Sequence, residues 1–333
     1  MSSKMELISD FNNILKSFKI KASCVGYRQI DNYFYYDLKL NPNARVKDIQ
    51  KYSDEISLAL QTPCKPSVKI LHNKGVVRLE FSSPRTKVLK LLDYFTNNYV
   101  PKGDINCLLG QKVDGKQVWM DLAKNPHMII SGTTGSGKST LLHNIIANLF
   151  NYNDVELFLV DPKSFEFTEY EKHFSDVEVL YSYDEALAML HAMLNVMELR
   201  YSRMRAGAPA ASMKSIVIII DEFADLIMQD KNDEFYIALC KLAQKCRAAK
   251  IHIILATQRP SVNIINGTIK ANFPARIACR VASHVDSKVI LDSSGAENLS
   301  GKGDALIRDN FRSLERFQIA YTDAVEVCSI FGK

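Results

Sequence analysis

The sequence predicts an α/β fold in which a larger domain with a mostly parallel sheet, residues 101–333, follows a small α+β domain, residues 1–100. Three observations predict it. Short β-branched apolar runs alternate with helical segments from His127 onward. A glycine-rich segment, Gly132–Ser139, stands between the first of these runs and a helical segment. Strand-like and helical spacing is mixed before the break at Pro101 and Gly103.

The small domain carries five predicted strand and helix segments. Tyr33–Leu40 alternates aromatic and polar residues as a strand does, and Ala44–Leu60 has helical apolar spacing. Val68–Ile70 and Val76–Phe81 flank a turn-forming segment and predict a hairpin. Thr86–Tyr99 has the spacing of an amphipathic helix. Together they predict a small α+β domain with one clear hairpin.

The larger domain contains six predicted strands. Their apolar, β-branched composition is typical of strands that are buried on both faces by helices. They are His127–Ser131, Val155–Val160, Val177–Leu180, Ile216–Ile220, Ile251–Ala256 and Arg276–Val281.

Composition indicates a soluble globular protein. Of the 333 residues 47% are hydrophobic and 24% charged, and no window approaches the roughly 18 to 20 apolar residues of a membrane-spanning helix. Met1–Asp10 lacks the pattern of a secretion signal. We expect a cytoplasmic protein without membrane insertion of its own. The net charge of +5 is compatible with a polyanionic partner or with ordinary surface variation.

Seven cysteines are scattered singly, without a CxxC pair or a histidine at metal-ligand spacing. This pattern favours buried thiols over disulfides or a metal centre. They are Cys24, Cys64, Cys107, Cys240, Cys246, Cys279 and Cys328.

A nucleotide site is predicted where the first strand of the larger domain ends. There a strand, a glycine-rich loop and the helical segment Thr140–Phe150 follow one another, as in a P-loop. The loop's N–H groups would surround phosphates, Lys138 would reach the β- and γ-phosphates, and Ser139 would hold Mg²⁺. A glycine-rich turn without a ligand is the alternative, and the flanking elements argue against it. We expect ATP to contact Gly132, Thr133, Thr134, Gly135, Ser136, Gly137, Lys138, Ser139 and Thr140.

Two further strand ends carry polar residues suited to this chemistry. Asp221 and Glu222 directly follow the strand Ile216–Ile220, at the edge of a parallel sheet where ligands bind. Asp221 would support Mg²⁺ together with Ser139, and Glu222 would be the general base for the attacking water. Gln258 follows the next strand and would orient water or sense the γ-phosphate. The alternative for a single strand-end acid is a solvated position.

Several segments together resemble the FtsK/SpoIIIE family of DNA translocases, within the HerA-FtsK superfamily, from about Ile105 to the C-terminus. The resemblance implies a RecA-like P-loop ATPase domain that uses ATP and Mg²⁺ to move double-stranded DNA through a ring of identical subunits, expected to be a hexamer. The first hundred residues resemble the family's α domain more loosely. The matching segments are Asp121–His127, Ser131–Ser139, Asp161-Pro162-Lys163, Met197–Tyr201, Asp221–Leu226, Ala256–Val262, Ile269–Pro274, Asp286–Asp292 and Gly295–Asp304.

The resemblance also implies residue roles that spacing alone does not give. Arg247 matches an arginine that acts on the neighbouring subunit's nucleotide, although the nearby lysines have the simpler explanation of a solvated basic face. Thr257, Arg259 and Lys270 match a loop that touches the DNA backbone in the pore. Phosphate contacts of this kind carry no sequence information, which suits a motor that moves along any DNA.

Two of the departures from the family pattern bear on function and domain organisation. His284 stands where the family usually has a lysine, which makes the charge there pH-dependent. A membrane-spanning N-terminus and a winged-helix γ domain are absent from the sequence, so we expect a minimal soluble motor, encoded by a mobile element and served by a recruiting partner.

Alternative functions stay open at this stage. Relatives of the family handle conjugative DNA transfer, DNA packaging or protein secretion, and a non-catalytic DNA-binding ring would keep the same fold. The presence of Lys138, Ser139, Asp221, Glu222, Gln258 and Arg247 together argues against the non-catalytic alternative.

Overall fold

The computed structural model describes residues 3–83, 87–95, 105–175 and 177–332. The chain forms two compact units. The first comprises residues 1–88, 111–116 and 298–300, and the second comprises 89–110, 117–297 and 301–333. The division at Val88 and Leu89 precedes the predicted boundary at residue 100, which lies outside the described residues.

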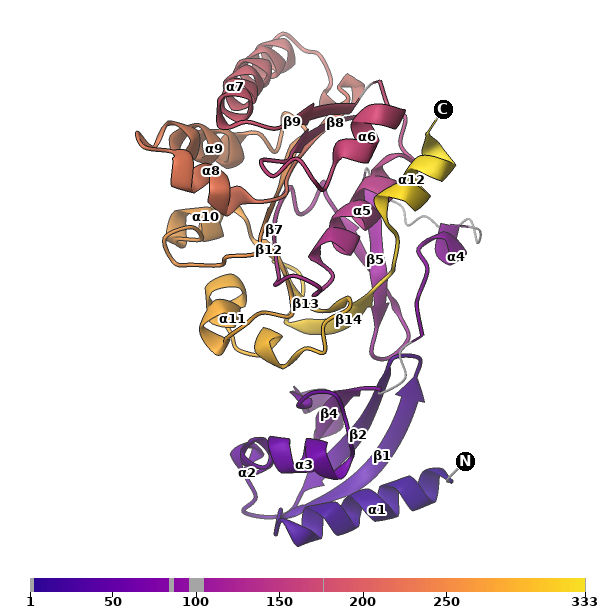
Figure 1. Ribbon diagram of the computed structural model, residues 1–333. Helices are drawn as coiled ribbons and strands as arrows, with labels where there is room; N and C mark the ends of the chain where they lie inside the picture. The colour runs from indigo at the N-terminus through magenta and orange to yellow at the C-terminus, as the bar shows by residue number, and fades with distance from the viewer. Residues whose placement is uncertain (1–2, 84–86, 96–104, 176, 333) are drawn as a thin grey trace. The chain divides into compact units, whose positions relative to one another are not determined.

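The first unit is a four-stranded antiparallel sheet with helices packed on one face (Figure 1). In spatial order the strands are β1 (Ala22–Ile30), β2 (Tyr33–Leu40), β4 (Val76–Ser82) and β3 (Ser67–Leu71). The helices are α1 (Lys4–Ser17), α2 (Val46–Lys51) and α3 (Ser53–Ala59).

Alternation along the strands builds the core of this unit. Tyr36 and Leu38 of β2 face the helices, and the ring of Tyr36 stacks on Phe11 of α1 with centroids 3.9 Å apart. The predicted strand Tyr33–Leu40 is confirmed, as is the hairpin formed by β3 and β4. The predicted helix Ala44–Leu60 is instead two helices that meet at Tyr52, and neither α1 nor β1 was predicted.

The predicted helix Thr86–Tyr99 is wrong over much of its described part. Only α4 (Leu92–Phe95) is helical. Upstream of it, Lys90 forms a β-bridge with Tyr321, and the N–H of Leu91 donates to the carbonyl of Tyr321 over 2.9 Å. Pairing with a distant segment has overridden the local helical spacing there.

The second unit is built on a ten-stranded sheet. The strands from β12 to β9 pair in parallel, and β12, β13 and β14 pair antiparallel. The predicted mostly parallel sheet and its six strands are confirmed, whereas β5, β6, β13 and β14 were not predicted. In spatial order the strands are β6 (Gln117–Asp121), β5 (Asn106–Lys112), β14 (Glu315–Ile319), β13 (Asp304–Arg308), β12 (Ala275–Cys279), β7 (His127–Ser131), β11 (Ile251–Thr257), β10 (Ser215–Ile220), β8 (Val155–Val160) and β9 (Val177–Leu180).

Helices cover both faces of this sheet (Figure 1). One face carries α5 (Lys138–Leu149), α6 (Thr168–His173) and α12 (Ala324–Phe331). The other carries α7 (Tyr183–Arg205), α8 (Phe223–Gln229), α9 (Glu234–Lys245), α10 (Gly267–Asn272) and α11 (His284–Leu291).

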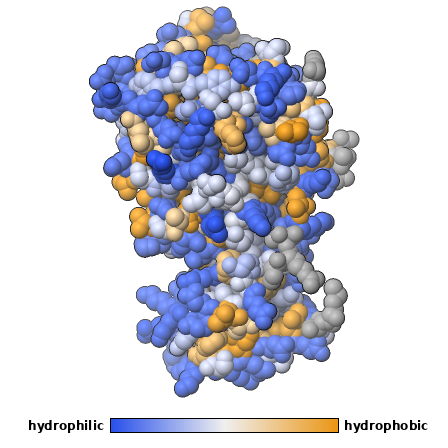
Figure 2. Space-filling model, viewed as in Figure 1, coloured by the Kyte–Doolittle hydropathy of each residue, from blue (hydrophilic) through white to orange (hydrophobic). Residues whose placement is uncertain are grey.

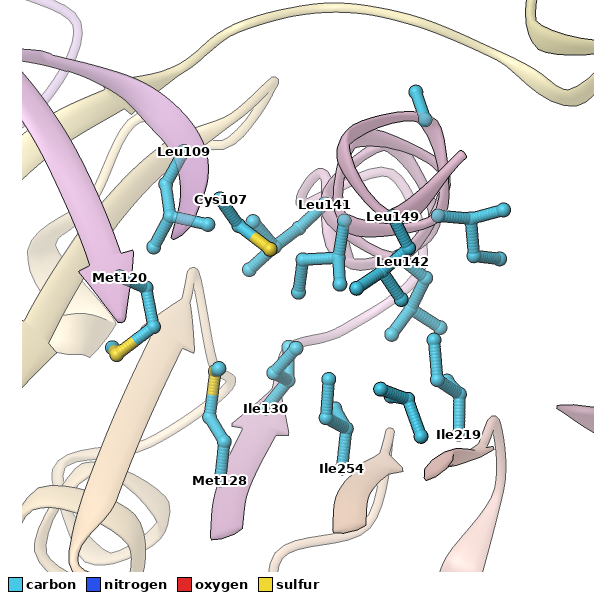
Figure 3. Close-up of a cluster of buried hydrophobic side chains, with 14 of the residues drawn as sticks. Cys107, Leu109, Met120, Met128, Ile130, Leu141, Leu142, Leu149, Ile219 and Ile254 are labelled. Carbon is cyan, nitrogen blue, oxygen red and sulfur yellow. The ribbon is translucent and has the colours of Figure 1, made fainter. Parts of the chain in front are cut away.

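The main core lies between α5 and the sheet (Figure 3). Met128 and Ile130, two residues apart on β7, both belong to the core under α5, as the two-residue period of a strand requires. Ile254 of the adjacent strand β11 and Ile219 of β10, the strand beyond it, join them, opposite Leu142 of α5. This packing fixes the helix, and with it the loop that precedes it, relative to the strand ends.

The remaining global features agree with the composition. Among the residues that the structure describes, no helix is both long and apolar enough to cross a bilayer. Six of the seven cysteines are buried, as predicted, and Cys64 is partly exposed. Hydrophilic side chains dominate the face shown in Figure 2, with hydrophobic ones scattered among them over the larger unit.

Candidate nucleotide site

The glycine-rich loop joins the end of β7 to the start of α5, as predicted. A Cβ atom on Gly132 would lie 2.4 Å from the Oγ of Ser136 and 2.7 Å from the Cβ of Cys279. Gly137 has φ +108, and a Cβ there would lie 2.6 Å from the Cα of Gly303. Both positions therefore require glycine because of close packing and, at Gly137, a left-handed backbone.

Neighbouring loops hold this segment in place. The N–H of Thr133 donates to the carbonyl of Arg280 over 2.9 Å, at the end of β12. The N–H groups of Lys302 and Gly303 donate to the carbonyls of Gly135 and Ser136 over 3.2 and 2.8 Å. The glycine-rich loop is therefore held by the segment that precedes β13 as well as by its own strand and helix.

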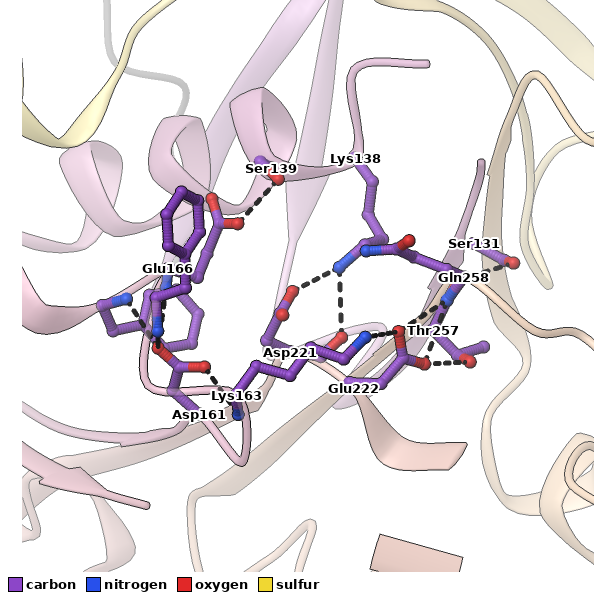
Figure 4. Close-up of polar contacts among 12 residues, drawn as sticks. Ser131, Lys138, Ser139, Asp161, Lys163, Glu166, Asp221, Glu222, Thr257 and Gln258 are labelled. Atoms are coloured by element: carbon purple, nitrogen blue, oxygen red, sulfur yellow. Dashed lines mark hydrogen bonds and ion pairs between the residues drawn. The ribbon is translucent and has the colours of Figure 1, made fainter. Parts of the chain in front are cut away.

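Lys138 and Asp221 meet at the centre of the site (Figure 4). The ammonium of Lys138 forms an ion pair with the carboxylate of Asp221 and donates to its carbonyl over 3.1 Å. Both side chains are buried. Burial raises the pKa of Asp221, although the charge of Lys138 opposes this shift.

Glu222 is fully buried beside them and is held by the end of β11. Its Oε1 accepts from the hydroxyl of Thr257 over 2.6 Å and from the N–H of Gln258 over 3.1 Å. The side chain of Gln258 in turn accepts from the hydroxyl of Thr134 over 3.2 Å. The predicted base and the predicted glutamine thus lie together against the glycine-rich loop.

The loop between β8 and α6 is a further part of the site. Asp161, which directly follows β8, accepts N–H donors from Phe165, Glu166 and Phe167 over 2.8, 2.7 and 3.0 Å. This single buried carboxylate folds the loop back on itself. The loop then points two charged side chains toward the residues described above (Figure 4).

The first of these side chains is Lys163. Its ammonium lies 2.9 Å from Oε2 of Glu222 and 3.7 Å from a carboxylate oxygen of Asp225. Partial burial alone would lower the pKa of Lys163, but the hydrogen bond and charge of Glu222 raise it. Lys163 therefore remains an ammonium in contact with the predicted base.

The second is Glu166. Its Oε2 accepts from the hydroxyl of Ser139 over 2.9 Å, and its Oε1 lies 2.9 Å from Nε2 of His143. Nδ1 of His143 lies 2.9 Å from the hydroxyl of Tyr170. Burial would raise the pKa of Glu166, but the hydrogen bonds from His143 and Ser139 and the charge of Lys138 lower it. Glu166 is therefore an anion that accepts the proton of the Ser139 hydroxyl.

This arrangement fits magnesium bound together with phosphates. Because the proton of the Ser139 hydroxyl points to Glu166, the lone pairs of the hydroxyl oxygen are available to a cation. Asp221 adds a carboxylate nearby. Among the residues that the structure describes, no group of three or more His, Cys, Asp or Glu side chains is placed to hold a metal ion.

Other predicted residues lie elsewhere. Arg247 is exposed and precedes the start of β11, at the edge of the sheet opposite to the P-loop. Arg259 is exposed just beyond Gln258. Lys270 forms an ion pair with Asp292 over 2.8 Å.

The positions of Thr257 and His284 in the structure change how these two residues are interpreted. Thr257 is buried with its hydroxyl on Glu222, so the structure does not support it as a DNA contact. His284 is the exposed first residue of α11, and the Ser283 and Asp286 on either side of it form the capping box of that helix. Ser283 and Asp286 therefore have a structural role at the start of α11.

The contacts of Glu166 and Lys163 were missed by sequence reasoning, although a signal existed. Asp161 follows its strand in the same way as Asp221 follows β10, and β8 pairs in parallel with β10. Acids at the ends of paired parallel strands lie at the same edge of the sheet. The segment after Asp161 could therefore have been assigned to the site.

Sequence comparisons agree with this geometry. The sequence matches the FtsK/SpoIIIE family over residues 93–211 and 206–262. The DNA translocase FtsK of Chlamydia muridarum is 37% identical over 325 residues, covering 88% of this chain and 40% of that protein. The DNA translocase SftA of Bacillus subtilis is 34% identical over 317 residues, covering 89% and 33%. The chain thus spans less than half the length of these relatives.

Solved structures share the fold. The conjugation coupling protein TcpA of pCW3 superposes with a TM-score of 0.68 at 21% identity, covering 98% of this chain and 99% of that one. The cytoplasmic domain of the type VII secretion ATPase EccC of Thermomonospora curvata gives 0.60 at 23% identity, covering 70% and 32%.

Proposed function

Because the chain belongs to the FtsK/SpoIIIE family, we propose that it hydrolyses ATP with Mg²⁺ at this site and uses the energy to move double-stranded DNA. One observation carries the proposal: Lys138, Asp221, Glu222 and Gln258 come from three adjacent strand ends and converge on one glycine-rich loop. Each of these residue types has a defined task in phosphoryl transfer.

The binding step follows from the contacts of Lys138 and Ser139. Phosphates in the loop would compete with Asp221 for the ammonium of Lys138, since both are anions within its reach. Asp221 would then be available to the waters of Mg²⁺, while Ser139 binds the ion directly. Mg²⁺ supplies charge neutralisation on the phosphates.

The hydrolysis step assigns water activation to Glu222. A buried carboxylate held by Thr257 and the N–H of Gln258 is fixed in one orientation, which general-base catalysis requires. The side chain of Gln258 lies between this base and Thr134 of the loop. That position suits a sensor of the γ-phosphate.

A ring-shaped homo-oligomer, expected to be a hexamer, completes the proposal. Arg247 lies at the opposite edge of its own sheet, so it would act only on the nucleotide of a neighbouring copy. For DNA contact we favour Arg259, which is exposed just beyond the catalytic strand end. Lys270 would first have to leave Asp292.

The test is steady-state ATP hydrolysis without DNA, with single-stranded DNA and with long linear duplex. Duplex should stimulate turnover more than single strands. Lys138→Ala should reduce turnover by about 10²-fold or more, because it removes the charge that stabilises the transferred phosphoryl group. Lys172→Ala, which removes an exposed lysine paired with Glu169, is the matched control.

Two other outcomes would favour one of the alternative functions. Turnover that duplex DNA leaves unchanged would contradict DNA translocation and favour a protein cargo. A correctly assembled ring without turnover would contradict the enzymatic assignment and favour a DNA-binding scaffold.

A further inference from the structure

The turn between α9 and β11, which carries Arg247, is held by two adjacent residues of α7, the helix that packs beside α9 (Figure 1). The guanidinium of Arg200 donates from Nη1 to the carbonyl of Ala249 over 2.5 Å. The hydroxyl of Tyr201 donates to the carbonyl of Lys245. These carbonyls lie two residues after and two residues before Arg247. The backbone is therefore fixed on both sides of the arginine.

Arg200 occupies a position where an apolar side chain would be expected. Met193, Met197 and Arg200 follow one another at helical spacing on the buried side of α7. Arg200 itself is 9% exposed, and burying a charged group is costly unless it is hydrogen-bonded. Packing of α7 against α9 would need only a residue such as leucine or methionine here. The guanidinium is therefore better explained by its bond to Ala249 than by packing.

Both carbonyls lie outside regular backbone pairing. Lys245 is the last residue of α9, where carbonyls have no partner within the helix. Ala249 is buried in the turn before β11. Within the turn, Lys250 has φ +54 and its N–H donates to the carbonyl of Arg247 over 3.2 Å. The two side chains of α7 thus complete the hydrogen bonding of a tight turn with one defined shape.

The side chain of Arg247 is exposed, in contrast to this fixed backbone. Among the residues that the structure describes, it forms no hydrogen bond or ion pair. Arg247 precedes β11 and Gln258 follows it, and a strand of seven residues is roughly 20 Å long. Arg247 therefore does not reach a nucleotide bound by its own chain, and its placement matters only to another copy.

We propose that Arg200 and Tyr201 are positioning residues that direct Arg247 toward the nucleotide of a neighbouring copy. They fix the backbone from which the long arginine side chain starts. This gives a task to Met197–Tyr201, a segment that carries the family resemblance but lies on α7, away from the glycine-rich loop. The inference rests on the proposed action of Arg247 across a subunit interface.

The first test measures ATP turnover with long linear duplex at saturating ATP. Arg200→Met keeps much of the side-chain volume but removes the donor. Its turnover should fall about 10- to 100-fold, because small displacements of a group that acts on the transition state have effects of this size. Tyr201→Phe removes only a hydroxyl and should lower turnover about two- to tenfold. Arg203→Met, which removes an exposed arginine one turn further along α7, is the matched control and should keep native turnover.

Mixed rings show which nucleotide site the loss affects. An equimolar mixture of Arg200→Met and Lys138→Ala should recover about a quarter of native turnover if subunits assort randomly. The Lys138→Ala subunit then supplies a correctly placed Arg247 to the intact P-loop of its neighbour. An equimolar mixture of Arg200→Met and Arg247→Ala should not recover, because neither subunit supplies a working arginine. Recovery only in the second mixture would place the effect of Arg200 in its own nucleotide site and overturn the inference.

Tyr201→Phe tests the inference independently if thermal unfolding shows that Arg200→Met is not folded. In a large excess of Lys138→Ala, nearly every Tyr201→Phe subunit has a neighbour with an intact Arg247. Turnover per Tyr201→Phe subunit should then equal that of native subunits diluted in the same way. A deficit that persists on dilution would contradict positioning across the interface.

The mixture of Arg247→Ala with Lys138→Ala separates this inference from the function on which it rests. If that mixture does not recover turnover, the action of Arg247 on a neighbouring copy is wrong. If it recovers while folded Arg200→Met and Tyr201→Phe both keep native turnover, or while folded Arg200→Met is not rescued by Lys138→Ala, only the positioning by α7 is overturned.

Discussion

Glu166 should control the affinity of the site for magnesium. Glu166→Gln keeps an oxygen that can accept the hydroxyl proton of Ser139 but removes the negative charge, and Glu166→Ala removes both. The native contact is 2.9 Å long and has a charged acceptor. Such bonds are roughly twice as strong as neutral ones.

The expected change in magnesium affinity follows from the loss of this hydrogen bond to Ser139. Residues that orient a metal ligand typically contribute 10- to 100-fold in metal affinity. We therefore expect the Mg²⁺ concentration for half-maximal turnover to rise about tenfold in Glu166→Gln and to approach about 100-fold in Glu166→Ala. The maximal rate at saturating Mg²⁺ should fall much less, because Glu222 and Lys138 are untouched.

The assay is ATP turnover titrated with free Mg²⁺ at fixed, saturating ATP, repeated with Mn²⁺. Glu171→Gln is the matched control, since Glu171 also accepts a hydroxyl, that of Tyr181 over 2.6 Å, but on the exposed side of α6. Thermal unfolding should show that the variants are folded. Unchanged half-saturation in folded Glu166→Ala would refute the assignment of Ser139 and Glu166 to magnesium binding.

Two further predictions concern the edge of the sheet opposite the site. Burial, together with the charges of His252 and Arg247, lowers the pKa of His127 to about 3; because the unfolded histidine titrates near 6.5, stability should fall as pH drops below about 6.5, by about 2 kcal/mol at pH 5. Urea unfolding at pH 7.5 and 5 should show this loss, and an equal loss in His127→Gln would contradict it. Arg247→Ala and Lys138→Ala should each be inactive, yet their equimolar mixture should recover about a quarter of native turnover if subunits assort randomly in a ring. No recovery in mixed rings would exclude action across the interface.

The larger unit was predictable because its signals are local and strong. Each strand of the parallel sheet is a short β-branched run, and the glycine-rich loop lies at the boundary of a strand and a helix. The structure shows why glycine stands at position 132, because a Cβ atom there would collide with Ser136 and Cys279. The position of Asp221, Glu222 and Gln258 at strand ends also predicts from the sequence that they lie together.

Long-range pairing explains what the sequence did not reveal. Lys90 lies in a segment with helical spacing but pairs with Tyr321. β13 and β14 are added to the sheet antiparallel to their neighbours and have no periodic signature that distinguishes them from loops. Thr257 was assigned to DNA from its place in a motif, and only the structure shows its hydroxyl on Glu222.

The glycine-rich loop is held in place by hydrogen bonds from a segment more than 160 residues further along the chain, Lys302 and Gly303. The carbonyls of Gly135 and Ser136 accept from Lys302 and Gly303, and the carbonyl of Gly303 accepts from the N–H of Ile319 on β14 over 2.8 Å. Backbone hydrogen bonds thus connect the glycine-rich loop to β14, and sheet pairing connects β14 through β13 and β12 back to β7. A substitution near Gly303, well downstream in sequence, is therefore expected to alter the position of the glycine-rich loop through these hydrogen bonds.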